Sequence, residues 1–131
     1  MKTLLVASAL ALTTTFASAQ DAPKFFADTY PEHALDEALK WYGTLRGEDA
    51  ALDTKTIELV MLGVSAQIPC RYCVHGHVTG ARAAGATEAE IREAIAAAAA
   101  VRMWSTVLNG MDYDYDDFVA ELDAMYDKPS N

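Results

Sequence analysis

The chain has 131 residues, of which 19 are acidic and 10 basic, so its formal net charge is −9. This charge argues against nucleic acids and anionic membrane surfaces as partners, because both are themselves negative. The length fits one domain, which is large enough to bury a core and small enough to gain from contacts in an oligomer.

The first nineteen residues have the pattern of a cleavable secretory signal. Lys2 precedes a short stretch of apolar residues, Ser and Thr, which leads to the small-x-small sequence at 17–19. The stretch is shorter than the roughly 20 residues that a membrane span requires, although an uncleaved anchor is the alternative interpretation. We therefore expect a signal peptide at 1–19, a single domain at 20–131, and a periplasmic or secreted protein with no membrane contact after cleavage.

Helical periodicity runs through the rest of the chain, without strand-like alternation of useful length. Asp53 or Thr54 is suited to cap one helix, and Thr87 with Glu90 forms a capping box before another. The prediction is a compact all-α domain of about five helices. We expect these helices at about 31–45, 54–67, 69–84, 88–108 and 116–126.

The expected helix at 54–67 is apolar nearly all round, so we expect it to be buried. Apart from Lys55 in its first turn, its only charged residue is Glu58. A carboxylate in such a helix is costly unless it is paired or hydrogen-bonded. Glu58 is therefore either a partly exposed acid near the helix start or a candidate for proton transfer. Gly76 in the next helix would allow a close approach to Gly63, which would bring Glu58 toward the cysteines.

The two cysteines, Cys70 and Cys73, stand at the start of the expected third helix. Because each helical residue turns by about 100°, Cys73 and His77 lie at about −60° and −20° relative to Cys70, and His75 lies at about +140°. A helix N-terminus favours the thiolate form of Cys70, and His77 is placed to exchange a proton with Cys73. A purely structural bridge across so short a loop would contribute less than the ~3 kcal/mol of a 15-residue loop. Cys70, Cys73 and His77 are therefore predicted to form one redox-active site.

Glu58, Cys70, Cys73 and His77 together form the pattern E-x11-C-x2-C-x3-H. This pattern resembles the signature of the alkylhydroperoxidase AhpD-like, carboxymuconolactone decarboxylase superfamily, and the resemblance extends over roughly residues 49–108. It implies a compact helical fold that assembles as a homo-oligomer, a trimer or a hexamer. It also implies that peroxide oxidises Cys73 to a sulfenic acid, that Cys70 resolves this to a disulfide, and that Glu58 and His77 relay protons.

The sequence departs from the best-known antioxidant members of that superfamily at Tyr72, where they have a histidine. The expected export is a second departure, because the resemblance implies that cytosolic members draw electrons from lipoyl-protein systems. We expect a thiol-dependent peroxidase or disulfide oxidoreductase that acts on a hydroperoxide or disulfide substrate. Its electrons would come from an unknown dithiol donor, and we expect neither a cofactor nor a metal.

Three other functions compete with this interpretation. A zinc or copper site would draw on Cys70, Cys73 and His77, because His75 points away from them. A non-catalytic redox-sensing module would use the same cysteines without turnover. Lactone decarboxylation is less favoured, because the resemblance implies that such enzymes typically lack the C-x2-C pair.

Overall fold

The computed structural model describes residues 22–127, in which six helices and no strand are present. The all-α prediction is confirmed, and the five predicted helices correspond to α2–α6 with small differences at their ends. The expected signal peptide lies outside the described residues. Among the described helices, none is both long enough and apolar enough to cross a membrane. The helices are α1 (Lys24–Ala27), α2 (Glu32–Thr44), α3 (Thr54–Gln67), α4 (Arg71–Ala83), α5 (Glu88–Gly110) and α6 (Tyr115–Tyr126).

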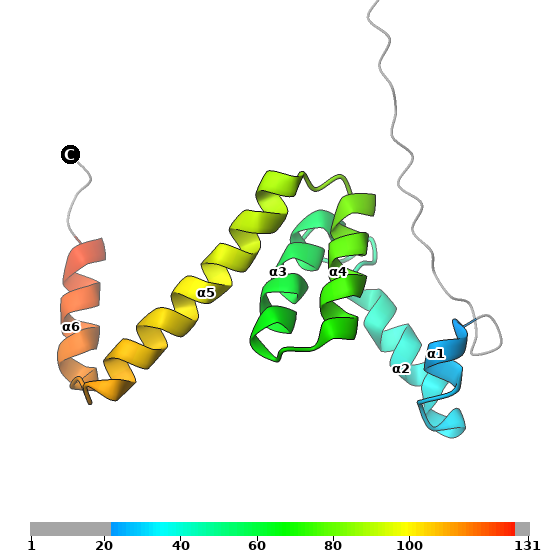
Figure 1. Ribbon diagram of the computed structural model, residues 1–131, viewed down its shortest axis with the longest axis horizontal. Coiled ribbons are helices and arrows are strands. Elements are labelled where there is room, and N and C mark those ends of the chain that lie inside the picture. The colour runs from blue at the N-terminus through cyan, green and yellow to red at the C-terminus, as the bar shows by residue number, and fades with distance from the viewer. Residues whose placement is uncertain (1–21, 128–131) are drawn as a thin grey trace, which may run out of the picture.

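The centre of the fold is a helical hairpin made of α3 and α4, and the first half of α5 packs against α3 (Figure 1). The core contains Leu62 from α3, Ala81 from α4 and Ile91 from α5, which are 0%, 0% and 4% exposed. Full burial of a leucine side chain contributes about 1.5–3 kcal/mol. This small apolar core therefore fixes α4 against α3, and the candidate site is built on these two helices.

Side-chain caps set where the central helices begin. Asp53 accepts a hydrogen bond from the backbone of the first turn of α3, and Thr87 with Glu90 forms the predicted capping box at the start of α5. Glu90 also accepts a hydrogen bond of 2.8 Å from Lys55. The bonds from Lys55 and then from Thr87 lower the pKa of Glu90 to about 2. The contact joins the first turns of α3 and α5, which keeps the two helices in register.

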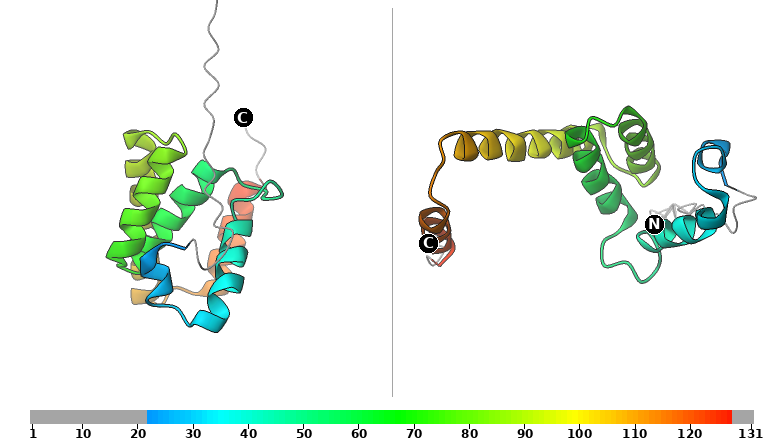
Figure 2. Two further views of the ribbon diagram at one scale, coloured as in Figure 1. Left: turned by 90° about the vertical axis from the view of Figure 1, so that its right-hand side faces the viewer. Right: turned by 90° about the horizontal axis from the view of Figure 1, so that it is seen from below.

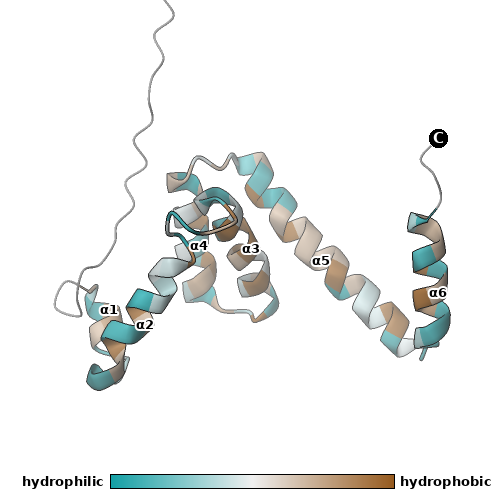
Figure 3. Ribbon diagram, turned by 180° about the vertical axis from the view of Figure 1, so that it is seen from behind, coloured by the Kyte–Doolittle hydropathy of each residue, from teal (hydrophilic) through white to brown (hydrophobic). Residues whose placement is uncertain are grey.

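One side of α3 is open, so the expectation that this helix is buried all round is wrong. Val60 and Val64 are 52% and 53% exposed. The reason is that α4 and α5 cover two sides of α3, whereas its outer side has no close neighbour within the described part of the chain. Figure 3 shows α3 as the most hydrophobic helix, with further hydrophobic positions along α5 and α6.

The second half of α5 leaves the hairpin, and α6 lies at its far end, away from the other helices (Figures 1 and 2). We call residues 101–126 the C-terminal arm. Isolated helices of such length are marginal in water, and packing of an apolar face normally stabilises them. The arm therefore presents an apolar surface that the described chain does not cover. Its exposed large apolar side chains are those of Val101, Met103, Trp104, Val107, Met111, Tyr113, Tyr115, Leu122, Met125 and Tyr126.

Candidate redox site

The two cysteines lie where α4 begins. Cys70 is the N-cap residue of α4, and its Sγ accepts a hydrogen bond from the backbone N–H of Cys73 at 3.2 Å. The two sulfurs form a disulfide, and the Cα atoms are 5.3 Å apart. The free N–H groups at a helix N-terminus favour negative charge, so this position stabilises the Cys70 thiolate after reduction. Both cysteines are partly exposed, so the disulfide is open to a reductant.

His77 and Glu58 contact each other across the hairpin, from α4 and α3. Nδ1 of His77 is 2.8 Å from Oε2 of Glu58, and the two side chains are 15% and 7% exposed. An ionised carboxylate only accepts hydrogen bonds, so Nδ1–H of His77 donates to it. The neutral imidazole then has its lone pair on Nε2. The contact therefore prepares His77 to accept a proton at Nε2, on the helix face that it shares with the cysteines.

Gly80 is the residue that lets the two helices approach at this point. A Cβ atom at Gly80 would lie 2.7 Å from the carboxyl carbon and from Oε2 of Glu58. The expected contact between Gly76 and Gly63 is wrong, because Gly76 has no atom within 4 Å of its Cβ position and Gly63 faces Ala98 of α5. The reason is that Gly63 is on the side of α3 that packs against α5, so it does not face α4.

Arg46 completes the site, and it was not predicted. It lies just after α2, and its Nε donates a 2.6 Å hydrogen bond to Oε1 of Glu58. Its guanidinium lies over the ring of Tyr42, 4.3 Å from the centroid, and Nη2 donates to the Tyr42 hydroxyl at 3.0 Å. Burial by itself lowers the pKa of Arg46, but the hydrogen bonds to Glu58 and Tyr42 outweigh it, so the pKa is raised. The one available sequence signal was the i, i+4 spacing of Tyr42 and Arg46, which places them on the same side of a helix.

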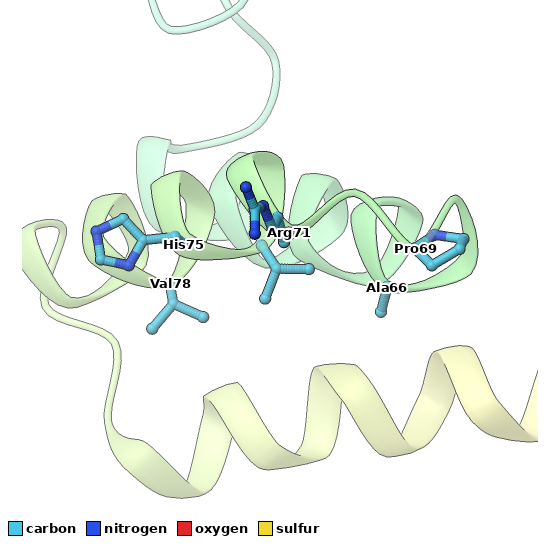
Figure 4. A pocket seen from close by; sticks show the side chains of 6 residues that line it. Ala66, Pro69, Arg71, His75 and Val78 are labelled. Atoms are coloured by element: carbon cyan, nitrogen blue, oxygen red, sulfur yellow. The ribbon is translucent and has the colours of Figure 1, made fainter.

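His75 points away from this site, as the helical angles predict. It is exposed and lines an open groove of about 510 Å³ on the side of α4 that faces α5 (Figure 4). None of the lining residues belongs to the set formed by Glu58, His77 and the two cysteines, so the groove is separate from the redox site. The other lining residues are Ala66, Pro69, Arg71, Val74 and Val78.

Residues 22–127 contain no group of three His, Cys, Asp or Glu side chains arranged to hold a metal ion. The three-ligand site considered from the sequence requires the sulfurs of Cys70 and Cys73 as separate thiolates. Here the sulfurs are bonded to each other, and Nδ1 of His77 is engaged by Glu58. A metal site of this kind would therefore require the reduced protein.

A family model for the carboxymuconolactone decarboxylase family matches residues 34–113, which is more than half of the chain. The chain belongs to the carboxymuconolactone decarboxylase family. This family includes decarboxylases and alkylhydroperoxidases, and it is the AhpD-like superfamily that the sequence pattern resembles. The matched segment contains Glu58, both cysteines and His77, and it also contains Arg46.

The chain is also similar to a protein of Paracoccus denitrificans named "Uncharacterized protein 4 in cox locus". The two sequences are 39% identical over 69 residues, which is 53% of this chain and 62% of the relative. The chain therefore spans less than two thirds of the length of that relative. No solved structure matches the chain. The family is thus established, whereas the activity has to be argued from the site.

Substituting Gly80 tests the close approach of the two helices in this family member. Gly80→Ala places a methyl group against the Glu58 carboxylate, and we expect this crowding to cost about 1–3 kcal/mol of unfolding free energy. Gly76→Ala is the matched control, because the same change in the same helix meets open space. The control should gain up to about 1 kcal/mol, since alanine is the better helix former. Urea unfolding followed by circular dichroism measures both, and equal effects would contradict the contact.

Proposed function

We propose that this protein is a thiol-dependent peroxidase or disulfide oxidoreductase whose reacting groups are Cys70 and Cys73. The observation that carries the proposal is the disulfide at the start of α4, on the helix face that also carries His77, with Glu58 bonded to His77. A helix N-terminus, a neighbouring base and a second thiol are the three features that a cycling cysteine requires. Family membership supports the same class of chemistry, because alkylhydroperoxidases are among the members.

The oxidising half of the proposed cycle consumes one hydroperoxide. Nε2 of His77 accepts the proton of the Cys73 thiol, and the thiolate attacks the outer peroxide oxygen. An S–O bond forms, the O–O bond breaks, and the leaving alkoxide takes the proton to become an alcohol. Cys73 is then a sulfenic acid. The Cys70 thiolate attacks its sulfur, an S–S bond forms, and the departing hydroxide is protonated to water.

The reducing half of the proposed cycle consumes one dithiol. One donor thiolate attacks the partly exposed disulfide, so that the S–S bond breaks, a mixed disulfide forms and one protein thiolate leaves. The second donor thiolate then attacks the donor sulfur of the mixed disulfide and releases the other protein thiolate. The donor leaves as a disulfide, and its two protons pass to the cysteines. A substrate disulfide in place of a hydroperoxide would oxidise the cysteine pair by the same exchange chemistry. Tyr72 is not part of the proposed relay, because the residue is 75% exposed and its hydroxyl contacts Arg71 at 2.9 Å. We further propose that the cycle runs in the periplasm or outside the cell, with a donor that is a dithiol of unknown identity.

A redox-sensing module is the second candidate, because the same disulfide would serve it. The two functions differ in turnover: a sensor is oxidised once per chain, whereas an enzyme consumes many equivalents of peroxide. Lactone decarboxylation is less well supported, because the most reactive groups of this site are sulfurs. Steady-state kinetics therefore separates the leading proposal from its competitor.

Hydroperoxide consumption with dithiothreitol as the reductant tests the cysteine roles. We expect wild type to turn over many times and Cys73→Ser to be inactive, because the attacked sulfur is lost. Cys70→Ser, reduced beforehand and then freed of dithiothreitol, should consume a single equivalent of peroxide and stop as a sulfenic acid at Cys73. Dimedone labelling with mass spectrometry detects that species. A Cys73→Ser variant as active as wild type would rule out the proposed cycle, and one equivalent consumed by wild type would favour the sensor.

The two histidines of α4 provide a matched pair for the base. His77→Ala should slow the reaction of the reduced protein with peroxide by about a hundredfold or more, because general-base catalysis contributes about 10²–10⁴. His75→Ala should react within about a factor of two of wild type, since His75 faces the separate groove. Stopped-flow measurement of thiol oxidation compares them. Equal losses in both variants would contradict the assignment of His77.

We also propose that the protein forms a homo-oligomer, a trimer or a hexamer, in which the C-terminal arm packs on a second copy of the chain. The apolar side chains of the arm and the open side of α3 at Val60 and Val64 are two surfaces of matching character. The arm also carries an acidic helix, with Asp116 and Asp117 in the first turn of α6. Burial of these surfaces against each other would supply the packing that the arm otherwise lacks.

Light scattering coupled to size-exclusion chromatography tests this assembly. Wild type should have the mass of three or six chains. Trp104→Glu should lower the mass to that of one chain, because a charge in an apolar interface costs several kcal/mol. Thr106→Glu places the same charge on the other side of α5 and should leave the mass unchanged. A monomeric wild type would refute the proposal.

A further inference from the structure

We propose that Arg46 is a positioning residue of the redox site, which holds Glu58 as an anion so that Glu58 fixes the tautomer of His77. This proposal rests on the proposed function, because Arg46 matters for catalysis only if the cysteines are catalytic. The arrangement itself belongs to the resting protein, so it is measurable without any substrate.

The two carboxylate oxygens of Glu58 have different hydrogen-bond partners. Oε1 accepts a hydrogen bond of 2.6 Å from Nε of Arg46, and Oε2 lies 2.8 Å from Nδ1 of His77. A guanidinium has no acceptor, so a proton on Oε1 would face the N–H of Arg46. A proton on Oε2 would leave the charge of Arg46 buried without its counter-charge, which is costly. Glu58 is therefore held ionised from one side and accepts a hydrogen bond on the other.

A contribution to the stability of the fold does not by itself explain why an arginine is at position 46. Its Nη1 is buried and has no hydrogen-bond partner within the described part of the chain. An unsatisfied buried donor costs about 1–3 kcal/mol, and a buried ion pair is weak evidence for stability. Yet the guanidinium is fixed in place, because Nη2 contacts the Tyr42 hydroxyl at 3.0 Å and the Met61 sulfur at 3.2 Å. A costly and well-fixed arginine is typical of a residue that orients a functional group.

The guanidinium of Arg46 affects which atoms of Glu58 and His77 carry a proton. With Arg46 in place, the guanidinium balances the charge of the Glu58 carboxylate, and Nδ1–H of His77 is directed at that carboxylate. Without the guanidinium, the buried pair would carry an unbalanced negative charge, and uptake of a proton by His77 would restore neutrality. Of the titratable and charged groups around His77, Glu58 from α3 contacts it directly, and Arg46, which lies just after α2, contacts Glu58. Tyr42 of α2 bonds to Arg46, and the two cysteines are on the side of α4 that His77 shares. In the proposed cycle the cysteines and His77 change state and Arg46 does not, so Arg46 fixes the arrangement of Glu58 and His77 from which each cycle starts.

Nitrogen-15 NMR of His77 in the oxidised protein tests the inference. In wild type near neutral pH, we expect Nδ1 to resonate as protonated and Nε2 as unprotonated. In Arg46→Met, both nitrogens should resonate as protonated at the same pH, with the midpoint of the His77 titration raised by about one pH unit or more. Arg46→Lys, which keeps the positive charge, should restore the wild-type midpoint.

Arg82→Met is the matched control, because Arg82 donates through Nε to Glu88 at the same 2.6 Å but on the exposed surface. It should leave the His77 resonances unchanged. A wild-type His77 protonated on Nε2 when neutral would overturn the inference, even if no Arg46 variant folds. The inference would also be overturned if the His77 titration had the same midpoint in Arg46→Met as in wild type. It would likewise be overturned if Arg46→Lys had the same midpoint as Arg46→Met. The measurement needs no peroxide, so loss of turnover in wild type would refute the proposed function and leave this result standing.

Discussion

The carboxylate of Glu58, buried between Arg46 and His77, is the interaction on which the rest of the site depends. A buried carboxylate requires a counter-charge and hydrogen-bond donors, and each of its oxygens has one such partner. The need to bring these groups together explains the glycine at position 80, where a side chain would collide with the carboxylate. The same contacts join Arg46, which lies just after α2, to α3 and α4, so the contacts that assemble the site also hold these helices together.

The position of the cysteines follows from the same hairpin. The turn between α3 and α4 ends at Cys70, so its sulfur caps α4 and accepts a hydrogen bond from Cys73. His77 is one turn further along α4, where Glu58 reaches it from the first half of α3. The two sulfurs thus lie at a helix N-terminus, on the side of α4 that also carries His77, and a helix N-terminus favours the thiolate form.

The sequence predicted those features that depend on local periodicity, and it missed those that depend on how helices meet. Spacing along a single helix was enough to predict three features. These are the start of α5 at Thr87, the common face of the cysteines and His77, and the opposite direction of His75. The role of Arg46 depends on the path of the loop before α3, which has no periodicity. The choice of Gly80 over Gly76 depends on which glycine of α4 the Glu58 side chain reaches, and this is a contact between two helices. The open side of α3 was missed because composition shows that a helix is apolar but not which of its sides another helix covers.

The central claim is that the Cys70–Cys73 disulfide is a working redox couple rather than a structural bridge. A redox titration of the folded protein, with alkylation of the free thiols and mass spectrometry of the peptide that contains both cysteines, tests this claim most directly. The account predicts a reduction potential above about −300 mV, within reach of biological dithiols. A potential well below about −300 mV would identify a structural disulfide and contradict the account.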